Sequence, residues 1–235
     1  MTYDELQILH EDNHIIVVVK PRGVPSQADD SGDPDMLSLV REYVKVTYNK
    51  PGNVYIGLVH RLDRPTGGVM VFARTSKAAE RLSADLREGN MEKRYFAVVL
   101  GQLRAEAETL EHYLVKDEGS NTTHVASPVA PGAKRAYLTY RALECQEGLT
   151  LCDITLGTGR SHQIRVQMQA IGRPVFGDMR YGGDKAVRGG LALWAYQLKL
   201  SHPVTHIAMT FRAAPPMTEI PWSLFRTVEA TLNKL

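Results

Sequence analysis

Apolar residues along the chain fall into short runs, separated by polar segments that contain glycine and proline. Runs of this length, rich in branched and aromatic side chains, are typical of buried β-strands. The clearest run covers residues 15–19, and Pro21 ends it because proline cannot continue a central strand. Similar runs predict further strands over residues 54–60, 69–73, 94–100, 136–145, 149–156, 193–200 and 207–211.

Three other segments carry apolar residues at helical spacing. Asp35 can cap the first helix, whose apolar face contains Leu37, Val40 and Val44. The other two helices are expected from near Ser76 to a stop at Gly89, and over residues 162–170 with Gly172 as the stop.

The order of these elements indicates the fold class. Most predicted strands follow one another directly, as in the hairpin expected around Glu147 and Gly148, and few helices intervene. This order favours a mixed α/β (α+β) fold, with a largely antiparallel sheet and flanking helices, over a doubly wound parallel sheet. We expect a single domain over residues 1–235, in which the polar residues 101–135 form an excursion with short strands, a candidate mobile segment.

Composition excludes several classes of protein. The hydrophobic content of 43% and charged content of 23% are ordinary for a globular chain. Neither a basic-then-apolar leader nor an apolar stretch of about 18 residues occurs, so the sequence predicts a cytoplasmic protein without a membrane segment. The two cysteines form no Cys/His cluster with ligand spacing, so no metal is expected. The net charge of +2 does not by itself establish nucleic-acid binding.

The first segment with candidate chemistry covers residues 60–68. Asp63 lies in a turn directly after a predicted strand, where a sheet can present a reactive side chain. Arg61 and Arg64 flank it. Taken alone, the segment fits a solvated surface turn equally well.

The second segment covers residues 157–165. Ser161 is a candidate N-cap, which places Arg165 in the first turn of the helix, where the helix dipole disfavours a cation. A cation there suggests an anionic partner, either a carboxylate or an RNA phosphate, although an ordinary surface arginine is the alternative. The Gly157–Gly159 stretch lacks the full pattern of a dinucleotide or nucleoside-triphosphate loop, so no such cofactor is expected.

The third segment is a strand that begins at residues 93–97. Tyr95 follows Lys93 and Arg94, so its ring could stack on a base while the cations contact phosphate. A half-buried strand tyrosine explains the same pattern.

Together these segments resemble the ordered motifs of the RluA-type pseudouridine synthases. The resemblance rests on residues 60–63 with Thr66 and Gly68, on residues 93–97, and on residues 159–166. Residues 20–23 resemble the first motif of that family, and residues 194–198, before His202, resemble its last. The likeness runs from about residue 8 to residue 222, and it implies a catalytic domain with a central cleft.

The resemblance also implies roles for individual residues. Asp63 would be the catalytic aspartate, Tyr95 would stack on the target uracil and assist late proton removal, and Arg165 would pair with Asp63. Arg64 would help displace the uridine from its stack, and Leu198 would pack beside the target ring. Further substrate contacts are expected from Arg61, Arg160, His162 and Gln163.

The family's reaction implies the partners as well. The substrate would be a structured ribosomal or transfer RNA, with no cofactor and no obligatory protein partner. No basic S4-like RNA-binding domain is expected before residue 8. Two alternatives remain open: a non-catalytic RNA-binding protein of the same fold, and a nucleoside or glycoside hydrolase. The hydrolase usually needs a second carboxylate, and no motif pairs one with Asp63.

Overall fold

The computed structural model describes residues 1–186 and 189–234. The fold is the predicted mixed α/β class, with antiparallel strand pairs and a few helices. The chain forms two compact units. The first contains residues Met1–Glu92 and Ala195–Ala213, and the second contains residues Lys93–Trp194 and Ala214–Leu235. Each unit is described by itself.

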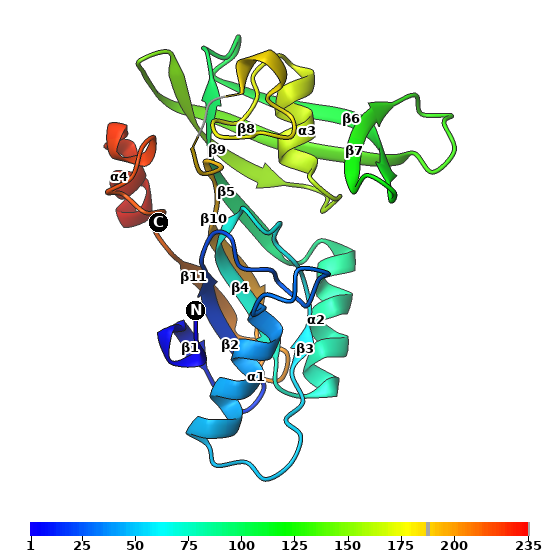
Figure 1. Ribbon diagram of the computed structural model, residues 1–235, viewed down its shortest axis with the longest axis vertical. Coiled ribbons are helices and arrows are strands. Elements are labelled where there is room, and N and C mark those ends of the chain that lie inside the picture. The colour runs from blue at the N-terminus through cyan, green and yellow to red at the C-terminus, as the bar shows by residue number, and fades with distance from the viewer. Residues whose placement is uncertain (187–188, 235) are drawn as a thin grey trace. The chain divides into compact units, whose positions relative to one another are not determined.

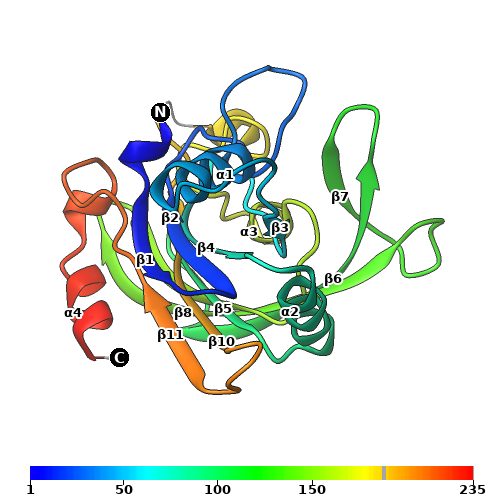
Figure 2. The ribbon, with the colours of Figure 1, turned by 90° about the horizontal axis from the view of Figure 1, so that it is seen from below.

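The first unit is built on the strand order β1-β2-β4-β10, with β3 paired to β4 and β11 paired to β10. Figure 2 shows β10 and β11 as a hairpin. All six residues of β2 are buried, which confirms the central strand predicted there. The strands are β1 (Gln7–Glu11), β2 (Ile15–Lys20), β3 (Gly57–Leu58), β4 (Gly67–Ala73), β10 (Leu193–Ser201, whose first two residues belong to the second unit) and β11 (Ala208–Arg212).

Two helices accompany these strands, α1 (Met36–Thr47) and α2 (Ser76–Glu88) (Figure 1). Asp35 caps α1 as predicted, because its side chain accepts the Ser38 N–H. Thr75 caps α2, and Gly89 ends it in a left-handed conformation that glycine adopts without strain. A short 3-10 turn, η1 (Tyr3–Glu5), precedes β1.

The second unit has the strand order β5-β9-β8-β6-β7, and every neighbouring pair is antiparallel. Its strands are β5 (Glu92–Leu100, whose first residue belongs to the first unit), β6 (Ala107–Asp117), β7 (Thr122–Ala126), β8 (Lys134–Gln146) and β9 (Leu149–Leu156). The predicted turn joins β8 to β9, since both Glu147 and Gly148 have positive φ. Helical segments are α3 (Gln163–Ala170), η2 (Gly183–Lys185), η3 (Trp222–Leu224) and α4 (Thr227–Lys234).

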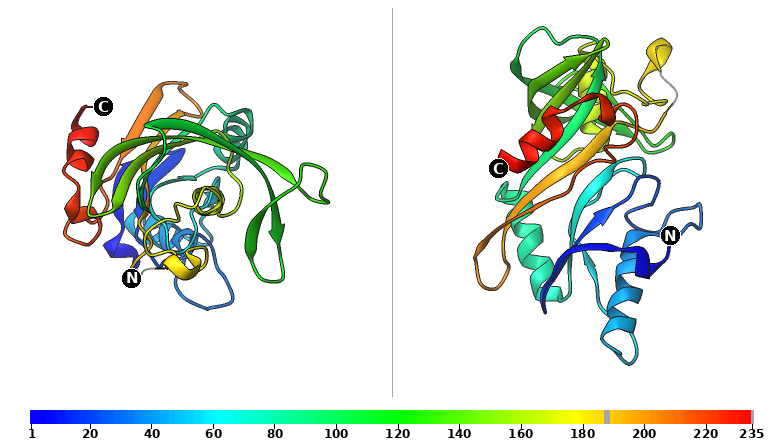
Figure 3. Two further views of the ribbon diagram at one scale, coloured as in Figure 1. Left: turned by 90° about the horizontal axis from the view of Figure 1, so that it is seen from above. Right: turned by 90° about the vertical axis from the view of Figure 1, so that its left-hand side faces the viewer.

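Residues 101–135 differ from the short strands expected there. They include the 11-residue strand β6, which curves together with β8 in Figure 3. Only Leu110 and Leu114 of β6 are buried, so the alternation that reveals a strand in a sequence is weak. Strands were expected in this segment, and β7 is a short one, but the length of β6 was underestimated because this strand is paired through its backbone rather than packed on both faces.

The strand predicted over residues 54–60 is wrong for most of its length, since only β3 forms. The ladder with β4 ends at Leu58. Two residues after Leu58, the Nε2 atom of His60 accepts the Val71 N–H at 3.1 Å, in place of a backbone carbonyl. A side chain therefore completes the edge of β4 and frees the following backbone to form a loop.

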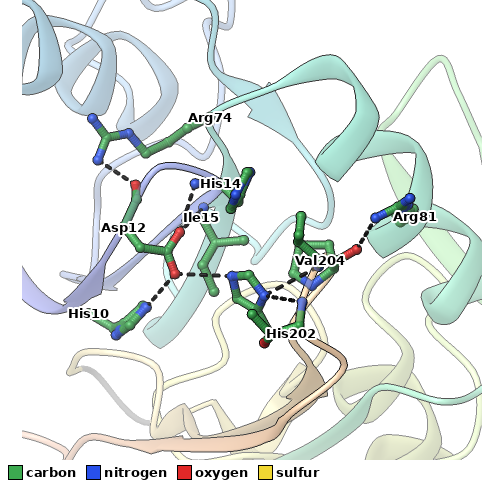
Figure 4. A network of polar contacts seen from close by, with 10 residues as sticks. His10, Asp12, His14, Ile15, Arg74, Arg81, His202 and Val204 are labelled. Atoms are coloured by element: carbon green, nitrogen blue, oxygen red, sulfur yellow. Dashed lines mark hydrogen bonds and ion pairs between the residues drawn. The ribbon is translucent and has the colours of Figure 1, made fainter.

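Asp12 joins the two hairpin turns of the first unit (Figure 4). Its Oδ1 atom accepts the backbone N–H groups of His14 and Ile15, and its Oδ2 atom contacts the Nε2 atoms of His10 and His202 at 2.9 and 3.1 Å. The Nδ1 atom of His202 accepts two backbone N–H groups, from Val204 and Thr205. The Nε2 atom of His202 therefore carries the proton that is donated to Asp12.

No helix within residues 1–186 and 189–234 has the length and apolar character needed to cross a bilayer.

We predict that Asp12→Asn lowers stability by about 1 kcal/mol at pH 7. Partial burial works to raise the pKa of Asp12, but hydrogen bonds from His10, Ile15 and His14 outweigh it and lower the pKa to about 2. The unfolded value is about 3.9. The stabilisation is therefore present above about pH 4 and is lost as the pH falls towards 2. Urea unfolding at several pH values measures this.

The exposed Asp30→Asn serves as the matched control, and it should leave stability unchanged at every pH. A difference between wild type and Asp12→Asn that stays constant from pH 6 to pH 3 would contradict the assignment.

Candidate active site

Asp63 lies in the loop between β3 and β4, in a turn closed by a hydrogen bond from the Thr66 N–H to the Asp63 carbonyl oxygen at 2.9 Å. The side chain of Asp63 is half-buried, whereas Arg61 and Arg64 on either side of it are exposed. Asp63 occupies a turn as predicted, although the strand expected directly before it is reduced to β3. The solvated surface turn is not what forms, because the backbone of this loop is held from inside the unit.

The side chain that holds the loop is Lys20, at the end of β2. It has no exposed surface, and its Nζ atom donates to the carbonyl oxygens of Pro21, Arg64 and Thr66 at 3.0, 3.0 and 2.7 Å. A lysine ammonium has three N–H donors, so these three carbonyls match it fully. Two of the three belong to the loop that carries Asp63, and the loop is thereby fixed to the central strand.

Burial makes the charge on Lys20 costly. Burial lowers the pKa of Lys20 to about 7, although the neighbouring Asp63 carboxylate works to raise this pKa. The neutral amine offers only two N–H groups, so one of the three carbonyls loses its donor when Lys20 deprotonates. The attachment of the loop is therefore complete only in the protonated state.

The segment after β2 fixes the residues on either side of Asp63. The Ser26 hydroxyl donates to the Leu62 carbonyl oxygen at 2.8 Å and accepts the Leu62 N–H at 3.1 Å. The Gly23 N–H donates to the Arg64 carbonyl oxygen at 2.8 Å. This role of Ser26 could not be predicted, since nothing in a sequence signals a hydroxyl that binds both the N–H and the carbonyl oxygen of one distant residue.

Gly68 fixes the other end of the loop. Its φ is +127°, and a Cβ atom at this position would lie 2.2 Å from the carbonyl oxygen of Ala195 in β10. Both the conformation and the close approach of the two backbones require glycine. This is the structural reason for a glycine at the end of the motif.

Arg64 is held by the first unit itself. Its Nε atom donates to the Gly23 carbonyl oxygen at 3.0 Å, and its guanidinium contacts the carboxylates of Asp29 and Asp33. Its side chain is still 42% exposed. The proposed role in displacing the uridine therefore requires an RNA that competes with these two carboxylates.

In the second unit, Arg165 has a carboxylate partner that the sequence reading did not identify. The Nε and Nη2 atoms of Arg165 donate to the two oxygens of Asp178 at 2.7 and 2.8 Å. The Asp178 side chain has no exposed surface. Its negative charge lowers the free-energy cost of burying the Arg165 guanidinium. The prediction of an anionic partner for a cation in the first turn of α3 is confirmed, and that partner is Asp178.

Asp178 also shapes the turn that follows it. Its Oδ1 atom accepts the N–H groups of Arg180 and Tyr181 at 3.0 Å each, which brings the Tyr181 ring to 4.9 Å from the Arg165 guanidinium. Burial works to raise the pKa of Asp178, but the contacts with Arg165 outweigh it, and the pKa lies below its ordinary value. The carboxylate is therefore ionised at neutral pH.

The remaining candidates on α3 serve the second unit in different ways. His162, rather than Ser161, precedes the first helical residue, with φ of +52°, and its Nδ1 atom lies 2.6 Å from the Tyr181 hydroxyl. Arg160 is exposed, and its Nε atom donates to the Arg135 carbonyl oxygen. The polar side chains of Arg160 and His162 therefore lie just before α3, in the segment where RNA contacts were expected.

Gln163 requires a correction. Its side chain is 3% exposed, donates to the Tyr137 carbonyl oxygen, and accepts the Thr158 hydroxyl and the Arg160 N–H. This amide holds the loop before α3 against β8. The geometry therefore supports a structural role for Gln163 rather than the expected RNA contact, because its acceptor oxygen is already occupied twice.

Tyr95 and Leu198 are both buried strand residues. Tyr95 lies in β5 opposite Ile154 and is 6% exposed, and Leu198 lies in β10 opposite Phe211 and is 1% exposed. Leu198 belongs to the first unit with Asp63, whereas Tyr95 belongs to the second unit with Arg165. The pairing of Asp63 with Arg165, and the placement of Tyr95 beside Asp63, stay predictions.

Within residues 1–186 and 189–234, no three His, Cys, Asp or Glu side chains are grouped so that they could hold a metal ion.

Comparison with known proteins decides the family. The model of the family described as RNA pseudouridylate synthase matches residues 14–170, which include the Lys20 strand, the Asp63 loop and the first turns of α3. The chain belongs to this family. The RluA-type resemblance read from the motifs, and with it the enzyme class of an RNA pseudouridine synthase, is confirmed.

Individual relatives agree with this assignment. The chain is 36% identical over 227 residues to ribosomal large subunit pseudouridine synthase D of Yersinia pestis, covering 90% of this chain and 67% of that protein. It is 32% identical over 206 residues to the uncharacterized RNA pseudouridine synthase YhcT of Bacillus subtilis, covering 86% and 66%. The chain thus spans about two thirds of the length of these relatives.

Solved structures show the same fold. Human RNA pseudouridylate synthase domain containing 4 superposes with a TM-score of 0.75 at 22% identity, covering 97% of this chain and 92% of that one. Human RNA pseudouridylate synthase domain containing 1 gives 0.75 at 21% identity, covering 100% and 96%. At this level of identity the likeness concerns the fold alone.

We predict that Lys20→Met in this pseudouridine synthase lowers kcat at least ~100-fold, because the loop that carries Asp63 loses its attachment to β2. Wild-type kcat should also fall as the pH rises through about 7, where Lys20 loses its third N–H. The residual activity of Lys20→Met should lack this alkaline loss. Steady-state kinetics from pH 6 to pH 9 measure both effects.

Lys77→Met, at an exposed position of α2, is the control and should retain the wild-type pH profile. An unchanged kcat in a folded Lys20→Met protein, verified by circular dichroism, would remove Lys20 from the support of the loop.

We predict that Asp178→Asn destabilises the protein by about 3 kcal/mol, because the Arg165 guanidinium is left buried without a carboxylate. Denaturant unfolding at pH 7 measures the change. Glu118→Gln removes an exposed carboxylate that pairs with Lys116, and it should change stability by less than about 0.5 kcal/mol. Equal effects of the two substitutions would show that the Asp178 pair adds nothing beyond a surface contact.

Proposed function

We propose that this protein isomerises a specific uridine in ribosomal RNA of the large subunit to pseudouridine, with Asp63 as the catalytic carboxylate. The observation that carries the proposal is the Asp63 loop of a family member, held at both flanking residues by Lys20, Gly23 and Ser26. A carboxylate whose backbone is fixed so completely is suited to attack or proton transfer at one position. RNA binding alone does not require this.

The choice of ribosomal RNA follows from the relatives. Several that are 31–36% identical carry the names ribosomal large subunit pseudouridine synthase C or D. Transfer RNA, which the motifs left open, has no such support among these relatives. The particular uridine is to be found by experiment.

The reaction is an isomerisation that needs no redox step and no phosphate energy. The N1–C1′ bond of the uridine breaks, the uracil turns, and C5 bonds to C1′. The proton on C5 is then removed and N1 takes up a proton, so no atom is gained or lost. Breaking the first bond places positive charge on the sugar and negative charge on the ring. A carboxylate can attack or stabilise the sugar, as in glycoside chemistry, or act as a base at the sugar.

The other groups would prepare the substrate. A uridine must leave its stack to reach Asp63, which costs a few kcal/mol, and stacking on Tyr95 and packing against Leu198 would offset this cost. Arg165, aimed by Asp178, would pair with Asp63 and orient its carboxylate. Arg61, Arg64, Arg160 and His162 would contact the RNA around the target.

We predict that Asp63→Asn abolishes pseudouridine formation, because the amide can neither attack the sugar nor accept a proton. Binding of RNA and stability should be largely preserved, since Lys20 and Ser26 hold the loop through backbone groups that the substitution leaves in place. Pseudouridine mapping of total RNA, from cells that lack the gene and carry either wild type or Asp63→Asn, measures the effect and identifies the uridine.

Asp30→Asn is the control and should restore the modification as wild type does. Substantial turnover by Asp63→Asn would refute the catalytic role. If deletion of the gene removes no pseudouridine from ribosomal RNA, the proposal is wrong, and a non-catalytic RNA-binding role takes its place.

A further inference from the structure

The exposed side of α1 lines a groove on the surface of the first unit. A hollow of about 610 Å³ follows the helix, and its lining includes Ser38, Arg41, Lys45 and Val46, residues that share one helical face. This face is opposite to the buried residues Met36, Leu39, Val40 and Val44. From Ser38 to Val46 the groove runs about 12 Å.

A second hollow, of about 340 Å³, continues the groove beyond the end of α1. Lys50 and Asn53 line both hollows, so the two share the loop of residues 49–54 as a common wall. Tyr55 and Arg74 belong to the second hollow. In Figure 1 this end of α1 and the loop after it form the bottom of the first unit.

The charge of the groove is one-sided. Among the residues that line the two hollows, Arg41, Lys45, Lys50 and Arg74 are cations, and Glu42 is the one carboxylate. Arg41 and Lys45 lie one helical turn apart on the solvent side of α1. Such a row of cations suits successive phosphates of a nucleic-acid backbone.

Aromatic rings lie beside these cations. Tyr48 is 41% exposed and Tyr55 is 50% exposed. The Arg74 guanidinium lies 4.5 Å from the centre of the Tyr48 ring, and its Nη1 atom donates to the Asp12 carbonyl oxygen, so this cation is fixed before any ligand binds. Exposed tyrosines next to arginine and lysine are typical of surfaces that stack bases while contacting phosphate.

The groove is connected to the catalytic loop through the start of α1. The Met36 N–H donates to the carbonyl oxygen of Pro25, and the next residue, Ser26, holds Leu62 beside Asp63. The start of α1 is therefore anchored at the catalytic loop, and Arg41 and Lys45 follow about 8 and 14 Å further along the helix. An RNA that presents a uridine at Asp63 can follow this helix.

We propose that the groove defined by α1 and residues 49–55 binds the backbone of the substrate RNA outside the target nucleotide. This inference rests on the proposed function. The groove would add affinity for long structured RNA, largely by charge, and would leave the chemistry at Asp63 untouched. A short hairpin that presents its uridine at Asp63 would not extend as far as the groove.

The test uses two labelled hairpin RNAs that carry the uridine identified by mapping, or a generic loop uridine if none is found. One has a short stem, and the other has the same stem lengthened by a full helical turn. Fluorescence anisotropy between 50 and 200 mM salt gives affinity and its salt dependence. The variant is Arg41→Ala with Lys45→Ala, and the matched control is Arg87→Ala with Lys199→Ala, two exposed cations elsewhere in the first unit.

The expected result is specific to the long hairpin. Arg41→Ala with Lys45→Ala should bind it at least about tenfold more weakly at ~0.1 M salt, with a salt slope shallower by about 2, and should bind the short hairpin like wild type. The kcat on the short hairpin should be unchanged. The control variant should match wild type on both RNAs.

Two results would overturn the inference. Equal weakening by both variants would show a general effect of net charge, and an unchanged slope for Arg41→Ala with Lys45→Ala would exclude RNA from the groove and favour a protein ligand. Failure of the proposed function is distinguishable, since it would appear as wild-type protein that forms no pseudouridine, whatever the anisotropy shows.

Discussion

A buried ammonium group determines how the first unit holds the loop that carries Asp63. Lys20 ends the central strand β2 without any contact with water, and three backbone carbonyls replace its hydration. Leaving such a charge unpaired would cost several kcal/mol, so the Arg64 and Thr66 carbonyls are obliged to stay near it. The shape of the loop around Asp63 is thus a consequence of solvating one cation with protein.

The second unit also contains a buried cation, but here a carboxylate side chain rather than backbone carbonyls compensates its charge. The Arg165 guanidinium is buried at the start of α3, where the helix dipole is unfavourable, and a carboxylate thirteen residues later in the chain compensates both costs. Asp178 uses its remaining acceptor capacity on two backbone N–H groups, which fixes its own position. In each unit a buried charged group is fixed by hydrogen bonds inside the protein.

Much of this fold could be predicted from the sequence, because the buried strands β2, β4, β5, β9 and β10 have continuous apolar runs and the helices have caps. The failures have physical causes. β6 exposes most of its side chains, and the edge of β4 is completed by the His60 imidazole, which no periodicity reveals. Asp63, Arg165 and Tyr95 were found through ordered motifs, whereas Ser26 and Asp178 act through contacts between distant residues. Gln163 was misread because a polar residue in a motif can serve the protein's own backbone.

Because Gly68 has no side chain, it couples the position of β10 to the position of β2 in the first unit. Gly68 is the ladder partner of Lys20, and its backbone lies against Ala195 of β10 with no atoms between to absorb a displacement. Leu198 sits three residues further along β10. A shift of β10, whether from packing around Leu198 or from the β11 hairpin, would therefore displace Gly68 directly. Because Gly68 pairs with Lys20, the end of β2 that carries the ammonium group would move with it.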